Sequence, residues 1–344
     1  MLQTESCVGC GSAKWEVRET WRTYRLATCA DCGVTFTLNP DYSRERYVAV
    51  YGDGASNLPV PARHEHVYVA PVTRLGLEAI AFKKFIPAPR LAPAERYALT
   101  WLKANAPRRS VIIECVCGTG RFLQALQRAG FEVTGTELSQ IVVDVLRTRG
   151  LRVVLGGLPD FPWNGPAPFA ILLFEVLEHL PDPSVVIGRL RGRFPSSCVI
   201  VSVPSPRRNA LLLHGERSLA DYPPNHYVRW TVLGLERVFR NAGYSDVQVI
   251  LPPPVGHEML PGLGRVVLRR RNVDSTQGHE GNGRRTTPVE PDRNARVTAR
   301  LGATLALWIL KSYHVAADII GNPLASQARS KGASAGSLLV IARP

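Results

Sequence analysis

The segment from Glu175 to His179 reads Glu-Val-Leu-Glu-His and places two carboxylates beside an imidazole. An imidazole titrates near neutral pH, so His179 is a candidate general base that removes a proton from a substrate hydroxyl. In the alternative interpretation, Glu178 and His179 cap the following helix and only support the site. His226, in a later loop, is the second candidate base, and its alternative is an incidental loop histidine.

Four cysteines near the N-terminus form two Cys-x-x-Cys pairs. Cys7 and Cys10 make the first pair and Cys29 and Cys32 the second, with eighteen residues between the pairs. This spacing is typical of a structural zinc site with four thiolate ligands. Such a site has no open coordination position, so we expect zinc to fold a small domain here and to take no part in chemistry.

A nucleotide-binding pattern lies between Val111 and Glu137, where an apolar run, a glycine turn, an amphipathic run and a second apolar run predict a βαβ unit. Gly118 and Gly120 lack a Cβ, so backbone N–H groups can approach a ligand where the helix begins. Glu137, at the tip of the second strand, can accept hydrogen bonds from ribose hydroxyls. Leu123 replaces the third glycine of the dinucleotide pattern, which favours an adenosine cofactor other than a hydride carrier.

Further periodic segments predict the elements that position these residues. The run Phe169–Phe174 is fully apolar and predicts a buried parallel strand. Ligands bind beyond the carboxyl ends of such strands, so Glu175 to His179 should face the cofactor. The other predicted helices are 92–106, 139–150, 185–194 and 231–242, and the other predicted strands are 151–155, 198–203 and 244–251.

The run Glu-Cys-Val-Cys-Gly-Thr-Gly, residues 114–120, resembles the first motif of class I S-adenosylmethionine-dependent methyltransferases. Glu-His-Leu after the fourth core strand resembles the same family. The resemblance implies a Rossmann-like α/β fold, a seven-stranded sheet of order 3-2-1-4-5-7-6, and S-adenosylmethionine with its methionine end near Glu114 and its ribose at Glu137. The implied cofactor-binding residues are Glu114, Val116, Gly118, Gly120, Glu137 and Glu175.

Three positions depart from the family pattern. Val116 stands where the family's first glycine is usual, and Ala170 stands where an aspartate is usual at the start of the fourth strand. The family's adenine-binding aspartate aligns with Gly157, with Asp160 as a substitute. These departures prompt one alternative function, a degenerate methyltransferase fold without catalysis.

A second resemblance concerns Glu175, Glu178, His179 and His226. Together they resemble the metal site of small-RNA 2′-O-methyltransferases and of ubiquinone-pathway O-methyltransferases. The resemblance implies a divalent ion that binds both oxygens of a vicinal diol or catechol and lowers the pKa of the hydroxyl. General base, metal ligand and structural support remain open as roles for these residues.

The chain divides into five expected regions. The apolar helix 301–320 inside the insertion is expected to be a lid over the substrate or to lie on an anionic membrane beside the basic loop 265–300. The regions are a zinc ribbon at 1–45, a linker at 46–91, a methyltransferase core at 92–254, an insertion at 255–335, and the final core strand at 336–344.

The formal net charge of +14 predicts an anionic partner, which can be a glycan, a nucleotide sugar, an acidic lipid or nucleic acid. The N-terminus lacks the pattern of a signal peptide, which predicts a cytoplasmic protein. We therefore expect a methyltransferase that acts on a small or carbohydrate-like acceptor, at oxygen. The competing hypothesis is an RNA methyltransferase or RNA-binding protein.

Overall fold

The computed structural model describes residues 5–41, 91–158, 160–206, 221–252 and 336–344, which all fall in one compact unit. The expected linker, the basic loop 265–300 and the expected helix 301–320 lie outside the described residues, apart from the last residue of the linker. Within the described ranges, no helix is long and apolar enough to cross a membrane.

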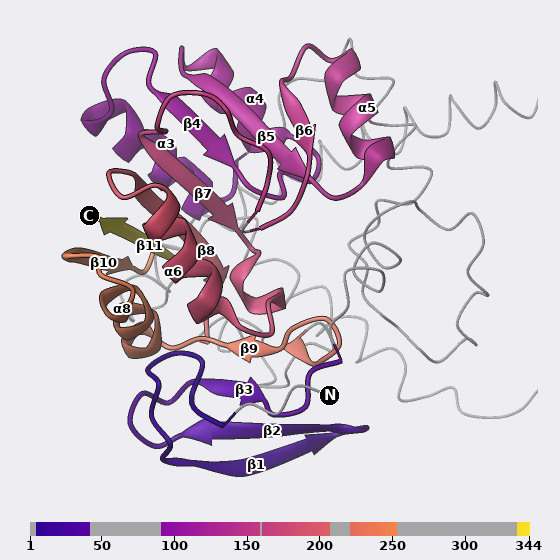
Figure 1. Ribbon diagram of the computed structural model, residues 1–344, viewed down its shortest axis with the longest axis vertical. Coiled ribbons are helices and arrows are strands. Elements are labelled where there is room, and N and C mark those ends of the chain that lie inside the picture. Colours follow the sequence, from indigo (N-terminus) through magenta and orange to yellow (C-terminus); the bar gives the residue numbers. More distant parts are fainter. Residues whose placement is uncertain (1–4, 42–90, 159, 207–220, 253–335) are drawn as a thin grey trace, which may run out of the picture. The chain divides into compact units, whose positions relative to one another are not determined.

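The N-terminal cysteines belong to a small antiparallel sheet. Its strands are β1 (Trp15–Trp21), β2 (Tyr24–Cys29) and β3 (Thr35–Thr37). A fourth strand, β9 (Val228–Arg229), comes from the other end of the unit and pairs antiparallel with β3, so the sheet order is β1-β2-β3-β9 (Figure 1). The ribbon sheet therefore includes two residues of the core.

The larger sheet has seven strands, in the order β10-β11-β8-β7-β4-β5-β6. Counted along the core, this is the predicted order 3-2-1-4-5-7-6, and the last segment of the chain is β11, antiparallel between β10 and β8. Both predictions are confirmed. The strands are β4 (Val111–Glu114), β5 (Glu132–Glu137), β6 (Val153–Leu155), β7 (Ala170–Phe174), β8 (Cys198–Pro204), β10 (Asp246–Ile250) and β11 (Ser337–Arg343).

The central strands are buried on both faces. Along β7, Ile171 and Leu173 belong to one buried cluster and Leu172 to the other, because successive side chains of a strand point to opposite faces. Such strands read as continuous apolar runs, which is why "FAILLF" predicted this strand correctly. Ala170, at the position of the family's aspartate, is completely buried at the start of β7.

Helices follow most of the parallel strands, and side-chain caps fix several of their first residues. Ser139 caps α5, and Thr231 caps α8 by accepting a hydrogen bond from Gly234 N. The helices are α3 (Pro93–Asn105), α4 (Arg121–Arg128), α5 (Gln140–Thr148), α6 (Pro183–Arg193) and α8 (Val232–Asn241), with a short 3₁₀ helix η1 (Leu177–His179) after β7.

One local prediction is wrong. The helix expected from Val185 begins at Pro183, because Asp182 accepts a hydrogen bond from Val185 N and proline suits the first helical position. Asp182 is therefore the cap, and the interpretation of Glu178 and His179 as caps of this helix fails. Both residues lie one turn earlier, in η1.

Candidate functional site

The turn after β4 carries the two glycines of the predicted cofactor motif, both in the left-handed region, with φ of 51° at Gly118 and 67° at Gly120. A Cβ on Gly120 would lie 2.8 Å from Leu146 Cδ2, so packing of the helix against its neighbour requires glycine there. A Cβ on Gly118 would meet no heavy atom within 4 Å. The open side of the turn is thus at Gly118, where a ligand can approach the backbone.

Val116, at the position of the family's first glycine, also has a left-handed backbone, with φ of 53°. This conformation is strained for a β-branched residue. Val116 N donates a hydrogen bond to Thr136 Oγ1 at 3.1 Å, and the half-buried side chain packs against the core. The sequence has lost the glycine at this position, but the backbone keeps the conformation that a glycine would adopt.

Glu137 joins the tip of β5 to this turn. Its Oε2 accepts a hydrogen bond from Gly118 N at 2.9 Å, and its Oε1 accepts from Leu138 N at 2.8 Å and Ser139 N at 3.2 Å. Burial raises the pKa of Glu137, while these three N–H groups act in the opposite direction. The carboxylate lies at the carboxyl end of β5, beside the turn after β4, which is the place predicted for ribose recognition.

Glu114, at the end of β4, is a buried carboxyl group. Burial raises its pKa well above the usual value, and the charge of Glu95 raises it further, while Arg121 lowers it. Arg121 Nη2 donates to Glu95 Oε1 at 2.6 Å. Glu114 Oε2 makes no hydrogen bond to the described residues, so a polar or cationic ligand group at this edge would satisfy it.

Gly157 stands at the position of the family's adenine-binding aspartate, so the chain has no carboxylate there. A Cβ on Gly157 would lie 2.5 Å from Leu138 Cδ2, so the leucine occupies the space that a side chain would need. Asp160, the suggested substitute, is exposed and accepts a hydrogen bond from Arg189 Nη1 at 2.9 Å. Among the described residues, Leu138 is the side chain that packs at the aligned position.

Three side chains converge after β7. Glu178 Oε1 lies 3.9 Å from His179 Nε2 and 4.0 Å from His226 Nε2, and the two imidazole rings are 4.7 Å apart in a T-shaped arrangement. One ligand atom from each residue falls within 4.8 Å of the others. We call these residues the two-histidine cluster. Two imidazole nitrogens and one carboxylate oxygen form a donor set that suits a divalent transition metal with open positions.

The hydrogen bond of His179 fixes the orientation of its ring. Its Nδ1 lies 2.6 Å from the carbonyl oxygen of Asn225, and a carbonyl can only accept, so Nδ1 carries the proton and Nε2 presents its lone pair to the cluster. Burial lowers the pKa of His179 to about 3, and the nearby His226 contributes in the same direction. The ring is therefore neutral at physiological pH, as a metal ligand must be.

His226 has an acidic neighbour. Its Nδ1 lies 3.5 Å from Asp221 Oδ1, while its Nε2 faces Glu178. A carboxylate in this position orients an imidazole and stabilises its protonated form. His226 therefore has the geometry of a metal ligand and also that of a general base.

Glu175 lies outside the cluster. Its exposed carboxylate accepts a hydrogen bond from Ser202 Oγ at 2.8 Å, and its backbone N–H donates to Ser202 O at 2.9 Å. The residue has φ of 53°, so the chain turns sharply as it leaves β7. Of the four suggested metal ligands, the structure brings together Glu178, His179 and His226.

The four N-terminal cysteines form the predicted group. Cys7 Sγ lies 3.5 Å from Cys32 Sγ, Cys10 Sγ lies 3.6 Å from Cys29 Sγ, and all four sulfur atoms lie within 4.8 Å of one another. These spacings suit Zn–S bonds of about 2.3 Å in a tetrahedral site. Burial raises the pKa of the Cys7 thiol to about 11, and a bound cation would reverse this by stabilising the thiolate.

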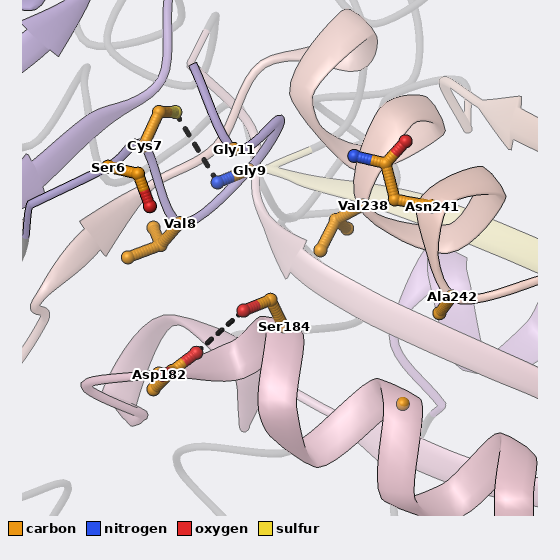
Figure 2. A pocket seen from close by; sticks show the side chains of 11 residues that line it. Ser6, Cys7, Val8, Gly9, Gly11, Asp182, Ser184, Val238, Asn241 and Ala242 are labelled. Atoms are coloured by element: carbon orange, nitrogen blue, oxygen red, sulfur yellow. Dashed lines mark hydrogen bonds between the residues drawn. The ribbon is translucent and has the colours of Figure 1, made fainter. Parts of the chain in front are cut away.

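A cavity of about 260 Å³ lies between the first cysteine pair and the helices α6 and α8. Figure 2 shows Ser6, Cys7 and Val8 on one side and Asp182, Ser184 and Asn241 on the others. In this cavity, Ser184 donates to Asp182 and Gly9 N donates to Cys7 Sγ. The cofactor turn and the two-histidine cluster do not line it.

Residues 90–249 match a family described as a methyltransferase domain. The segment 90–249, which we call the methyltransferase domain, is thus similar to that family. The match covers β4 to β10 of the larger sheet, together with the cofactor turn and the two-histidine cluster.

Relatives of the methyltransferase domain include two proteins named ubiquinone biosynthesis O-methyltransferase. The one from Xylella fastidiosa (strain 9a5c) is 34% identical over 83 residues, 22% of this chain and 34% of that protein. The one from Paracidovorax citrulli is 30% identical over 128 residues, 33% of this chain and 52% of that protein. The chain thus spans between a third and about half of the length of these relatives.

Among solved structures, a SAM dependent methyltransferase from Archaeoglobus fulgidus superposes with a TM-score of 0.40. Its identity to this chain is 14%, and the superposition covers 73% of this chain and 94% of that one.

Sequence reasoning missed the residues that support the two-histidine cluster. Asp221, Asn225 and Tyr227 surround the two histidines, and Tyr227 N donates to Glu178 O at 2.8 Å. The sequence Pro-Asn-His-Tyr drew attention to His226 alone. The one available sequence signal was that Asp221 lies five residues before His226.

We predict that the purified protein contains about one zinc per chain at the four-cysteine site, because four thiolates close a tetrahedral zinc site. Cys29→Ser should lose that zinc, as measured by elemental analysis. Cys198→Ser is the matched control, since this buried cysteine lies in β8 outside the group. Equal zinc contents in the two variants would contradict the assignment.

Val116→Gly should relieve backbone strain of about 1–3 kcal/mol. Glycine adds a chain-entropy cost of about 1 kcal/mol, so we expect the unfolding free energy to rise by about 0–2 kcal/mol. Val199→Gly, at a fully buried strand position, should cost about 3 kcal/mol. Denaturant unfolding of both variants measures the difference, and equal losses would show that Val116 is not strained.

Proposed function

We propose that the chain transfers a methyl group from S-adenosylmethionine to an oxygen of a small hydroxyl-bearing acceptor. The observation that carries this proposal is the convergence of Glu178, His179 and His226 within 4.8 Å, directly after the strand end that faces the cofactor edge. The printed names of the relatives, which are O-methyltransferases, support the same reaction.

The cofactor edge suits a ligand that carries positive charge. Glu114 and Glu137 are both buried, and burial raises the pKa of each, so their ionised forms lack full compensation, although three N–H groups act on Glu137 and the charge of Arg121 acts on Glu114. The sulfonium and amino groups of S-adenosylmethionine would supply it, and the open backbone at Gly118 admits the ligand. We assign the methionine end to Glu114, the ribose to Glu137, and the turn contacts to Gly118 and Gly120.

A divalent ion is the proposed second cofactor, held by Glu178 Oε1, His179 Nε2 and His226 Nε2. When bound, such an ion supplies Lewis acidity that lowers the pKa of a hydroxyl group. His179 serves this role better than that of a base, because a group with a pKa of about 3 takes up a proton poorly at neutral pH. Asn225 fixes its tautomer, and Asp221 orients His226.

A second candidate mechanism uses His226 as a general base without a metal. The observation in its favour is the 3.5 Å approach of Asp221 Oδ1 to His226 Nδ1, which would stabilise the imidazolium after proton uptake. In that mechanism Glu178 supports the imidazole from the Nε2 side. The two mechanisms differ in whether Glu178 and His179 must hold an ion.

The acceptor is proposed to be a small molecule or a carbohydrate-like molecule, with an anionic group favoured by the net charge of +14. RNA methylation is the competing proposal. Purified protein that carries nucleic acid, lost steeply as salt is raised, would favour RNA.

The decisive experiment measures binding of S-adenosylmethionine by calorimetry and binding of Mn²⁺ by electron paramagnetic resonance. We expect both to bind, and Glu178→Gln and His179→Ala to weaken Mn²⁺ binding by about 100-fold, since each removes a ligand. Glu175→Gln is the matched control and should bind Mn²⁺ as the wild type does. No heat of binding with S-adenosylmethionine would rule out the enzyme and favour the degenerate fold.

Methyl transfer to a catechol probe such as 3,4-dihydroxybenzoate then separates the two mechanisms. If the metal is required, added chelator and His179→Ala should each reduce turnover by about 100-fold or more while zinc remains in the ribbon. If His226 is the base, His226→Ala alone should have this effect. Wild-type turnover in both histidine variants would exclude both mechanisms.

A further inference from the structure

The zinc ribbon and helix α8 are joined through the backbone of the cysteine pairs. Three carbonyl groups of these turns accept hydrogen bonds from side chains of the α8 region. The bonds run from Thr231 Oγ1 to Cys32 O at 2.7 Å, from Arg237 Nη1 to Asp31 O at 3.0 Å, and from Asn241 Nδ2 to Cys10 O at 3.3 Å. The turns that would hold zinc are therefore also the turns that contact the methyltransferase domain.

A single buried valine fits between two glycines at this junction. A Cβ on Gly234 of α8 would lie 2.1 Å from Val34 Cγ2, and a Cβ on Gly9 would lie 2.9 Å from the same atom. Val34 is completely buried. Glycine inside α8 costs helix stability, so its presence here is explained by the close approach of the ribbon.

The ribbon also holds the segment that carries His226. In β3 and β9, Phe36 pairs with Val228, and Thr37 N and Oγ1 both donate to Tyr227 O, at 3.0 and 3.1 Å. Asp41 Oδ1 accepts from Tyr227 OH at 3.0 Å and from Tyr24 OH at 2.8 Å. His226 immediately precedes this fixed tyrosine.

The opposite side of the same segment contacts η1. Tyr227 N donates to Glu178 O at 2.8 Å, and the carbonyl oxygen of Asn225 accepts a hydrogen bond from His179 Nδ1 at 2.6 Å. His226 therefore lies in a segment fixed on one side by the ribbon and on the other by the residues of the two-histidine cluster.

A pocket of about 170 Å³ opens beside His226, and the ribbon forms part of its wall. Gly33 and Thr35 come from the ribbon, Ser205 follows β8, and Asp221 and Trp230 flank the histidine. A molecule bound there would contact both the ribbon and the methyltransferase domain. Its walls offer carboxylate, imidazole and hydroxyl groups, which suit a small molecule with several hydroxyl groups.

We propose that the ribbon is the positioning element of the acceptor side of the site. It holds residues 221–231 so that His226 meets Glu178, and it forms one wall of the acceptor pocket. The proposal rests on the proposed function only in naming this side as the acceptor side. The cofactor turn is built from β4, β5 and α4.

The test uses the full chain with Gly234→Ala, whose methyl group would collide with Val34. We expect hydrogen exchange of the backbone in residues 221–231 to accelerate by about tenfold or more, because the ribbon no longer protects this segment. Exchange in residues 111–120 and the affinity for S-adenosylmethionine should stay at wild-type values. Zinc content should also be unchanged, since the ribbon remains folded.

Two variants control this result. Val34→Ala combined with Gly234→Ala restores the lost space and should return the exchange of residues 221–231 toward the wild-type rate. Gly192→Ala in α6 is the matched helical glycine, with no heavy atom within 4 Å of its Cβ position, and should change nothing.

The proposal is overturned if Gly234→Ala leaves exchange at 221–231 unchanged. It is also overturned if the variant loses S-adenosylmethionine binding together with protection of 221–231, because the ribbon would then support the whole domain. A wild-type protein that binds no S-adenosylmethionine refutes the proposed function instead, and the exchange measurement still decides the role of the ribbon.

Discussion

The backbone of Tyr227 makes the hydrogen bonds on which the two halves of the candidate site depend. Its N–H donates to Glu178 O in η1, and its C=O accepts from Thr37 in the ribbon. One residue thus connects the strand end of the methyltransferase domain to the four-cysteine sheet. None of these bonds involves an imidazole nitrogen, so the connection does not depend on the protonation state of His226.

The cofactor side of the site depends on a different physical effect, the burial of two carboxyl groups. There the parallel strands are buried on both faces, and Glu114 and Glu137 are carboxyl groups placed in that buried edge, where their ionised forms are disfavoured. Desolvated carboxyl groups gain most from a cationic ligand. Val116 adds backbone strain at the same edge. A bound cationic group would offset part of the cost of burying these carboxyl groups.

Much of this fold could be predicted from the sequence because it is encoded locally. Apolar runs such as 169–174, the glycine turn at Gly118 and the paired cysteines each specify their structure within a few residues. The pairing of β3 with β9 could not be predicted, since it joins strands of three and two residues that are almost 200 positions apart. Short strands carry no periodic signal.

The separation of Glu175 from the two-histidine cluster was equally hidden. Sequence spacing places it three residues before Glu178, which would be one face of a regular helix. The left-handed turn at Glu175 breaks that relation and directs its carboxylate to Ser202. The left-handed backbone conformation at Glu175 is unfavourable for most residues other than glycine, and a glutamate in the sequence gives no sign that it occurs.

The two candidate metal sites have different expected roles, one structural and one chemical. Four sulfur ligands would close the coordination shell of an ion at the ribbon site, so that ion could only stabilise a fold. Two imidazoles and one carboxylate leave coordination positions open at the second site. In the proposed arrangement, the closed site would position the open one through geometry alone, because the cysteine turns bind α8 and the adjoining strand pairs with β9, two residues after His226. A reaction at the second site would depend on zinc that touches no reactant.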